Sequence, residues 1–185
     1  MNSKGSRCCL FIDIAALANH PNLIQKPSSV VTVSSLTVLQ SLSSGVTEIT
    51  VPSSTMNDAS LTMLDLSRFR RLKKIVIRSD CFMYVRKVKM IGLNELESVV
   101  IGENSFTRYK STSFISPSSF RNFYLKNCPK LKSLTIGRCS FSDYTVIEIE
   151  NVDALEEIDI GNTYEWSYNF NYASLELKSV LIHSK

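Results

Sequence analysis

The chain has 185 residues, a formal net charge of +4, and 44% hydrophobic and 21% charged residues. These values are typical of one globular domain that can bury a sizeable core. No apolar run approaches the roughly 18 residues needed to cross a bilayer, which excludes a membrane span within this sequence.

Residues 1–33 lack the apolar pattern that organises the rest of the chain. Their apolar run, CCLFIDIAALA, follows two basic residues and ends like a signal cleavage site at Ala18, although Asp13 interrupts it. Three interpretations stay open: a cleaved signal, a short amphipathic segment that caps the first repeat, and disorder. The next stretch, HPNLIQKPSS, indicates a linker. We therefore predict a partly disordered cap and linker at 1–33 and one repeat domain at 34–185.

From residue 46 onward the chain repeats an apolar triplet whose second and third members follow the first by three and five positions. Strong copies are Leu72/Ile75/Ile77, Leu96/Val99/Ile101, Leu131/Leu134/Ile136 and Leu155/Ile158/Ile160, with weaker copies at Val46/Ile49/Val51 and Leu177/Val180/Ile182. An apolar residue stands eight positions before each strong copy, at Leu64, Val88, Phe123 and Ile147. The repeat is about 24 residues long, and one copy carries about eleven more.

An aromatic residue follows the first member of three triplets by ten positions, at Phe82, Phe106 and Phe141, with Met56 in the matching position of the first copy. In the fourth strong copy Trp166 falls one position late. The last two members of each triplet lie on the same side of a short strand, because side chains alternate along a strand. Such a pair cannot shield itself from water. Successive repeats must therefore stack, about 4.8 Å apart, into continuous apolar rows.

The segment CPKLKSLTIGRC resembles the cysteine-containing leucine-rich repeat, and LESVVIGENSF and LKKIVIRSDCF look more like its BspA-like form. In that form a second strand replaces the outer helix of each repeat. The resemblance, which covers roughly residues 46–182, implies a mainly β fold with little helix. It implies a solenoid of about five rungs, with two short parallel strands per rung forming two facing parallel sheets. The usual asparagine position holds Asp80, Asn104, Cys139 and Thr163, so we expect no continuous asparagine ladder.

Charge is distributed unevenly along the repeats. Nine basic residues lie between residues 68 and 89, and seven acidic residues lie between 148 and 165 without a base among them. The predicted register places Lys74 and Arg78 at one end of an outward row and Glu157 and Asp159 at the other. Two interpretations remain: solvated faces, or a graded surface that binds a protein partner of opposite polarity or associates head to tail with its own copy. The acidic end and the low net charge disfavour nucleic acid as a partner.

Two departures from the repeat are candidate contact segments. The extra residues of the long copy, 107–119, include Arg108, Tyr109 and Phe114, and are either a recognition loop or a tolerated surface excursion. In the second segment, aromatic residues alternate with polar ones at Tyr164, Trp166, Tyr168, Phe170 and Tyr172. This aromatic row is either a hydrophobic cap on the last repeats or an exposed platform that stacks on a sugar, a peptide or a base.

The ends and the cysteines bear on assembly and location. The last stretch, LELKSVLIHSK, begins a further repeat. The strand edge there is either short and covered by the aromatic segment or open to an edge-to-edge dimer. Five cysteines without zinc-ribbon spacing indicate buried, reduced thiols. The absence of a glycosylation sequon agrees with this reading, so a cytoplasmic or otherwise intracellular protein is predicted. Cleavage after Ala18 would instead indicate secretion.

The sequence predicts no catalytic residue, cofactor or metal site. The only histidines, His20 and His183, lie outside the well-formed repeats, and no phosphate-binding or zinc-binding motif is present. We therefore predict a non-catalytic binding or scaffolding module that recognises a protein or peptide on the exposed sheet face and on the 107–119 loop. The alternative is a secreted or cell-surface, adhesin-like repeat protein that binds a host or glycan ligand through the 164–172 aromatic row.

Overall fold

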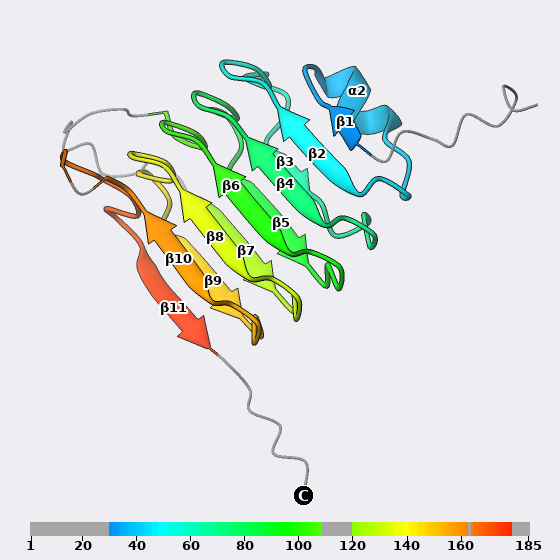
Figure 1. The fold of residues 1–185 in the computed structure, drawn as a ribbon. Coiled ribbons are helices and arrows are strands. Elements are labelled where there is room, and N and C mark those ends of the chain that lie inside the picture. The colour runs from blue at the N-terminus through cyan, green and yellow to red at the C-terminus, as the bar shows by residue number, and fades with distance from the viewer. Residues whose placement is uncertain (1–29, 109–119, 163, 179–185) are drawn as a thin grey trace, which may run out of the picture.

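The computed structural model describes residues 30–108, 120–162 and 164–178. In this part of the chain almost all regular structure is β, and the one helix is α2 (Leu36–Ser41). The strands form two parallel sheets (Figure 1). Within the described residues, the larger sheet has six strands in the order β1-β2-β4-β6-β8-β10 and the smaller has five in the order β11-β9-β7-β5-β3.

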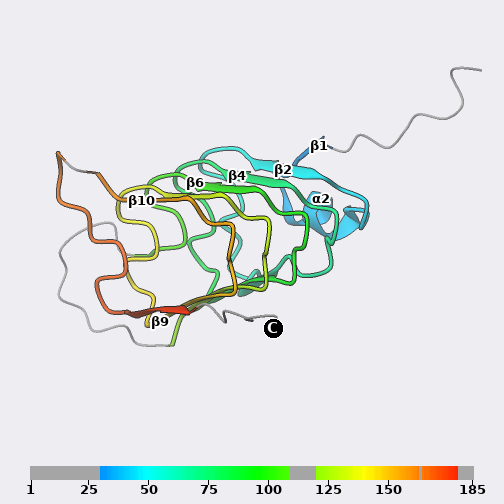
Figure 2. The ribbon, with the colours of Figure 1, turned by 60° about the horizontal axis from the view of Figure 1, so that its bottom comes forward.

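The strands of the six-stranded sheet are β1 (Val30–Thr32), β2 (Glu48–Val51), β4 (Lys74–Ile77), β6 (Ser98–Ile101), β8 (Ser133–Ile136) and β10 (Glu157–Ile160). Those of the five-stranded sheet are β3 (Met63–Asp65), β5 (Lys87–Ile91), β7 (Asn122–Lys126), β9 (Val146–Glu150) and β11 (Ser174–Lys178). From β3 onward the chain visits the two sheets in turn. Figure 2 shows the sheets lying opposite one another, and a single hydrophobic core contains the inward side chains of both.

The predicted register of the triplets is confirmed in the six-stranded sheet. Ile49, Ile75, Val99, Leu134 and Ile158 stand side by side on successive paired strands. Their outward neighbours on each strand are polar or only half-buried, as expected for strands with one face against a core. Period-two alternation therefore determines which side chains enter the core.

The five-stranded sheet aligns the second apolar series in the same way. Leu64, Val88, Phe123 and Ile147 are neighbours across paired strands, and Leu175 extends this row on β11. The assignment of Leu177 to a further triplet is wrong, because Leu177 pairs with Ile149 within this sheet. Both kinds of strand present two apolar residues two positions apart, so the spacing alone could not separate them. The other members of that triplet lie outside the described residues.

The recurring aromatic residues form one stack through the core. The ring centroids of Phe82 and Phe106 are 4.9 Å apart, and those of Phe106 and Phe141 are 4.8 Å apart, with nearly parallel planes. Phe170 continues the stack at 5.8 Å from Phe141. The placement of Trp166 in this series is therefore wrong, since a longer connection after β10 delivers Phe170 instead.

These aromatic residues share an unusual backbone conformation. Phe82, Phe106, Phe141 and Phe170 all have positive φ, between 56° and 60°, and Met56 has φ 61°. A bulky residue in the left-handed region is strained. Stacking of the buried rings offsets that strain, and the same sharp turn can then recur between strands of opposite sheets.

A ladder of hydroxyl groups runs beside the aromatic stack in place of an asparagine ladder. The backbone N–H of Cys81 donates to Ser105 Oγ at 3.2 Å, and that of Ser105 donates to Ser140 Oγ at 3.0 Å. Ser140 Oγ in turn donates to the Gly102 carbonyl at 2.7 Å. Small side chains at this position therefore satisfy buried backbone groups of adjacent connections.

The end of the fold nearest the N-terminus is covered. β1 lies inside the 1–33 segment predicted as cap and linker, and it pairs in register with β2. Ser35 caps α2 by accepting a hydrogen bond from Val38 N at 3.3 Å. Leu36 and Leu39 of α2 pack on the core, and Val33 is fully buried. Residues 1–29 lie outside the described part of the chain.

Candidate functional site

The opposite end of the six-stranded sheet leaves core-type side chains exposed. Ile158 and Ile160 of β10 are 42% and 37% exposed, whereas their neighbours in register on β8, Leu134 and Ile136, are 0% and 1% exposed. The residue types and the strand geometry are the same in both strands. The difference arises because no strand of the described chain lies beyond β10.

The five-stranded sheet ends in the same way. Leu175 and Leu177 of β11 are 51% and 60% exposed, while Ile147 and Ile149 on the neighbouring strand are 0% and 2% exposed. Fully burying one such side chain contributes on the order of 1.5 to 3 kcal/mol. Covering this end, which we call the open end, with another polypeptide would therefore add several kcal/mol of apolar burial.

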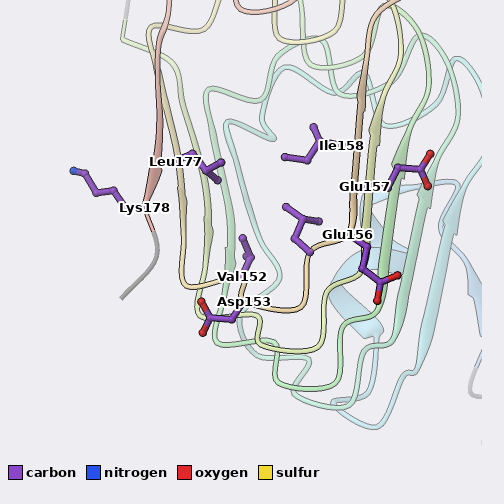
Figure 3. A pocket seen from close by; sticks show the side chains of 8 residues that line it. Val152, Asp153, Glu156, Glu157, Ile158, Leu177 and Lys178 are labelled. Carbon is purple, nitrogen blue, oxygen red and sulfur yellow. The ribbon is translucent and has the colours of Figure 1, made fainter. Parts of the chain in front are cut away.

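A pocket of about 310 Å³ opens between the two terminal strands. It is lined by Val152, Asp153, Leu155, Glu156, Glu157, Ile158, Leu177 and Lys178. Ile158 and Leu177 point from opposite walls into the space between β10 and β11, whereas Glu157 and Lys178 point away from it (Figure 3). The open end therefore has an apolar centre and a charged rim.

Both terminal strands also present a free edge. β10 pairs with β8 on one side, and β11 pairs with β9 on one side, with no further strand among the described residues. In β8 the Ile136 carbonyl accepts a hydrogen bond from Gly161 N at 2.8 Å. The equivalent carbonyl on β10 belongs to Ile160, and it lies at the free edge. Such an edge is a template for another extended chain.

The outer side of β10 is acidic and lacks compensating bases. Glu157 and Asp159 are exposed, and no ion pair joins either of them to another described residue. The outer face of the five-stranded sheet is different, since Lys126 pairs there with both Glu148 and Glu150, and Lys89 lies 3.6 Å from Asp65. The acids of β10 are therefore available to a basic partner.

The structure separates the predicted aromatic row into two parts. Phe170 packs into the core stack, as the cap interpretation requires, and Tyr168 is half-buried. Tyr164 and Trp166 are 94% and 81% exposed, as a platform requires. These residues belong to the connection from β10 to β11, at the open end (Figure 1).

Polar contacts hold this connection against the preceding one. Asn169 Nδ2 donates to the carbonyls of Gly137 at 2.8 Å and Ser140 at 3.1 Å. An ion pair at 2.9 Å joins Arg138 to Glu165, which stands between the two exposed rings in the sequence. Tyr164 and Trp166 therefore project from a supported segment.

The other predicted charges lie away from the open end. Lys74 and Arg78 are exposed on and just after β4, and two strands, β6 and β8, separate β4 from β10. Glu48 stands beside Lys74 in the same outward row. Along that row the charge is therefore negative at β2, positive at β4, absent at β6 and β8, and negative again at β10.

The long copy is secured at its base by residues that the sequence analysis did not single out. Arg121 is 3% exposed and forms an ion pair with Asp143 at 2.7 Å. It also donates to the carbonyls of Val85 at 2.5 Å and Met83 at 3.0 Å. A hydrophobic repeat contains no signal for such a group, because the arginine occupies no repeated position.

Arg108 is the one predicted contact residue of the long copy inside the described part of the chain. The backbone N–H of Arg108 donates to Asp143 Oδ2 at 3.2 Å, and the guanidinium of Arg108 lies 5.4 Å from the centre of the Tyr84 ring. Tyr109 and Phe114, with the rest of 109–119, lie outside the described residues. The side chain of Arg108 is exposed and remains a candidate contact.

The cysteines that the structure describes, Cys81, Cys128 and Cys139, are buried. Burial raises the pKa of the Cys81 and Cys128 thiols, which lowers their reactivity at neutral pH. The described residues contain no cluster of histidine, cysteine and acidic side chains that could hold a metal ion. His20 and His183 lie outside the described residues. No helix in the described ranges has the length and hydropathy of a membrane span.

Comparison with known proteins identifies no relative. No family model matches the chain. No curated protein and no solved structure shows significant similarity to it. Function is therefore inferred from the sequence pattern and from the geometry of the open end.

Proposed function

We propose that the chain is a non-catalytic binding or scaffolding module, built as a leucine-rich-repeat solenoid of about five rungs, that recognises a protein or peptide. The regular spacing of the apolar triplets and the alternation of strands between two parallel sheets support the solenoid. A stack of this kind supplies a rigid surface on which contact residues keep fixed positions. That property suits recognition and requires no catalytic group.

The observation that carries the proposal is the exposure of Ile158, Ile160, Leu175 and Leu177 at two free strand edges. A free edge offers backbone hydrogen bonds to an extended polypeptide, and the neighbouring apolar side chains supply burial. Tyr164 and Trp166 add two large exposed rings, a residue type that often contributes strongly to interface affinity. The open end thus combines three elements of a polypeptide-binding site.

Other surfaces remain secondary parts of this proposal. A large partner would also contact the outward row of the six-stranded sheet, which includes Lys74 and Arg78. It would further contact the predicted 107–119 loop, with Arg108, Tyr109 and Phe114. Glu157 belongs both to that row and to the rim of the open end, and Asp159 follows it in the same row. A partner that covers the rim would therefore approach the sheet face as well.

A second candidate function is an adhesin-like protein at the cell surface or outside the cell. The exposure of Tyr164 and Trp166 favours it, because paired aromatic rings also stack on sugars. It requires export, whereas the cysteine content favours an intracellular location. N-terminal sequencing of the mature protein decides between them: a cut after Ala18, with glycan binding that Trp166→Ala abolishes, would favour the adhesin.

The principal test is affinity capture from extract of the native cells, followed by mass spectrometry. A photo-crosslinking amino acid replaces Ile160 in one sample and Val76 in the other. Both are apolar residues of the six-stranded sheet, but Ile160 lies at the open end and Val76 lies in the middle of the sheet face. We expect crosslinks to a defined polypeptide from position 160 that fall when Trp166→Ala is added.

Two outcomes would contradict the proposal. The first is the absence of any polypeptide crosslink from both positions. The second is an equal, non-selective set of crosslinks from the two positions, which would indicate only exposed apolar surface. Crosslinks confined to position 76 would move the binding surface to the sheet face and away from the open end.

A further inference from the structure

We propose that the occupant of the open end is an extended segment of another protein that adds parallel to β10 and alternates apolar with basic residues. This inference rests on the proposed function and names the chemistry of the partner. Every strand pair in the described chain is parallel and in register, so an added strand meets the same pattern that β10 itself follows.

The backbone at the free edge determines how the new strand must bond. Glu157 N donates to the Lys132 carbonyl at 3.1 Å, and Gly161 N donates to the Ile136 carbonyl at 2.8 Å. Each donor thus belongs to an outward position, and each acceptor belongs to an inward position of the preceding strand. In the added strand, the N–H groups of outward residues would therefore donate to the carbonyls of Glu156, Ile158 and Ile160.

The side chains at the edge determine the composition of the new strand. Its inward residues would lie against Ile158 and Ile160, which are exposed now and demand apolar neighbours. Its outward residues would lie beside Glu157 and Asp159, for which no described residue supplies a counter-ion. Opposite charges on neighbouring strands stabilise a pair and like charges destabilise it, so lysine or arginine fits these positions.

This chain does not supply such a strand from its described residues. β5 has the required alternation, with Lys87 and Lys89 outward and Val88 and Met90 inward, but it is paired on both sides. β1, at the other end of the same sheet, carries no charged residue, and α2 covers that end of the core. Two-fold pairing of β10 with its copy would place carboxylates beside carboxylates. The described residues therefore supply no occupant for this edge, and we assign it to another protein.

The test measures binding of a fluorescein-labelled nine-residue peptide of alternating lysine and valine by fluorescence anisotropy. We expect the wild-type protein to bind it and to bind a glutamate-valine peptide at least about tenfold more weakly. Glu157→Lys should largely remove this preference, because one base and one acid, Asp159, then face the added strand. Glu48→Lys is the matched control, because it makes the same change in the same outward row at the opposite end of the sheet, and it should leave the preference unchanged.

Backbone methylation separates strand addition from simple attraction of charges. Methylating the backbone nitrogens of the lysine residues removes the donors that face β10, so this peptide should lose binding. Methylating the backbone nitrogens of the valine residues alters the edge of the peptide that faces away from β10. This peptide should keep most of its binding. Equal binding of the two methylated peptides would overturn the parallel arrangement.

Three further outcomes are decisive. If neither charged peptide binds while crosslinks at position 160 still require Trp166, the basic strand is wrong and the proposed function stands. If those crosslinks are absent too, both fail. If sedimentation shows a dimer of the free protein that Ile158→Lys dissociates, the occupant is a second copy of this chain and the inference is overturned.

Discussion

Ile158 lies directly beside Leu134 in the register of the six-stranded sheet, yet it is 42% exposed and Leu134 is fully buried. The two residues have the same role in their own strands. Their difference in exposure comes from position, since among the described strands β8 has a neighbour on both sides and β10 has a neighbour on one side. This comparison provides a direct measure of how incomplete the open end is.

Leu134→Ala should therefore lower the free energy of unfolding by about 2 to 5 kcal/mol, the usual cost of truncating a buried leucine. Ile158→Ala should cost about 1 kcal/mol, because roughly half of that side chain already contacts water. Urea denaturation of both variants measures the two values. Equal losses would show that β10 is covered in the protein in solution.

Removing one member of the buried ion pair of Arg121 and Asp143 should lower the free energy of unfolding more than replacing both members by apolar residues. Burial raises the pKa of Asp143, and the adjacent Arg121 guanidinium opposes that rise. Arg121→Met leaves an unpaired buried carboxyl group, so we expect a loss of about 3 to 5 kcal/mol. The double change Arg121→Met with Asp143→Leu should lose less than Arg121→Met alone.

A matched control for this pair is Lys130→Met, which removes an exposed ion pair with Glu95 at 2.8 Å. Its cost should stay within about 1 kcal/mol. All variants are compared by urea denaturation at neutral pH. A double variant that is less stable than both single variants would show that the ion pair itself, and not the burial of unpaired charge, dominates this site.

Trp166 is the one tryptophan of the sequence, so its fluorescence reports on the open end without interference. Because it is 81% exposed, its emission should resemble that of tryptophan in water, and acrylamide should quench it efficiently in the free protein. Addition of a bound partner should shift the emission to shorter wavelength. Blue-shifted, protected emission in the free protein would exclude an exposed ring.

The Lys126 pair with Glu148 and Glu150 should make stability depend on pH in the alkaline range. The hydrogen bond to Glu148 raises the pKa of Lys126, against the opposing effect of burial, and Glu150 acts in the same direction as Glu148. Because the folded pKa lies above the unfolded one, the stabilisation is complete below the unfolded value of about 10.4. It is lost as the pH rises through the folded value.

Lys126→Met should consequently cost about 0.5 to 1 kcal/mol at neutral pH, and the difference from wild type should shrink above about pH 10.4. Lys87→Met, on the neighbouring strand of the same sheet, serves as the control, because no ion pair joins Lys87 to another described residue. Urea denaturation across this pH range measures both. A constant difference for Lys126→Met would assign its cost to lost packing on Tyr124, whose ring lies 5.4 Å from Lys126 Nζ.

The sequence alone determined which side chains face the core. Alternation with period two places Ile75 and Ile77 on one side of β4 whatever surrounds the strand, and the constant spacing within each triplet predicts which residues of neighbouring strands stand side by side. The mainly β character and the two parallel sheets were expected from the resemblance to leucine-rich repeats, and the structure confirms them for the described residues.

The tertiary structure determined which residues pack against one another and which side chains are left exposed. Phe170 rather than Trp166 completes the aromatic stack, because the path of the connection after β10 selects the ring. Arg121 meets Asp143 across 22 positions of sequence without any repeated signal. Ile158 is open to water because no strand of the described residues lies beyond β10. Burial and ion pairing depend on residues that are distant in the sequence, and only the folded chain brings those residues together.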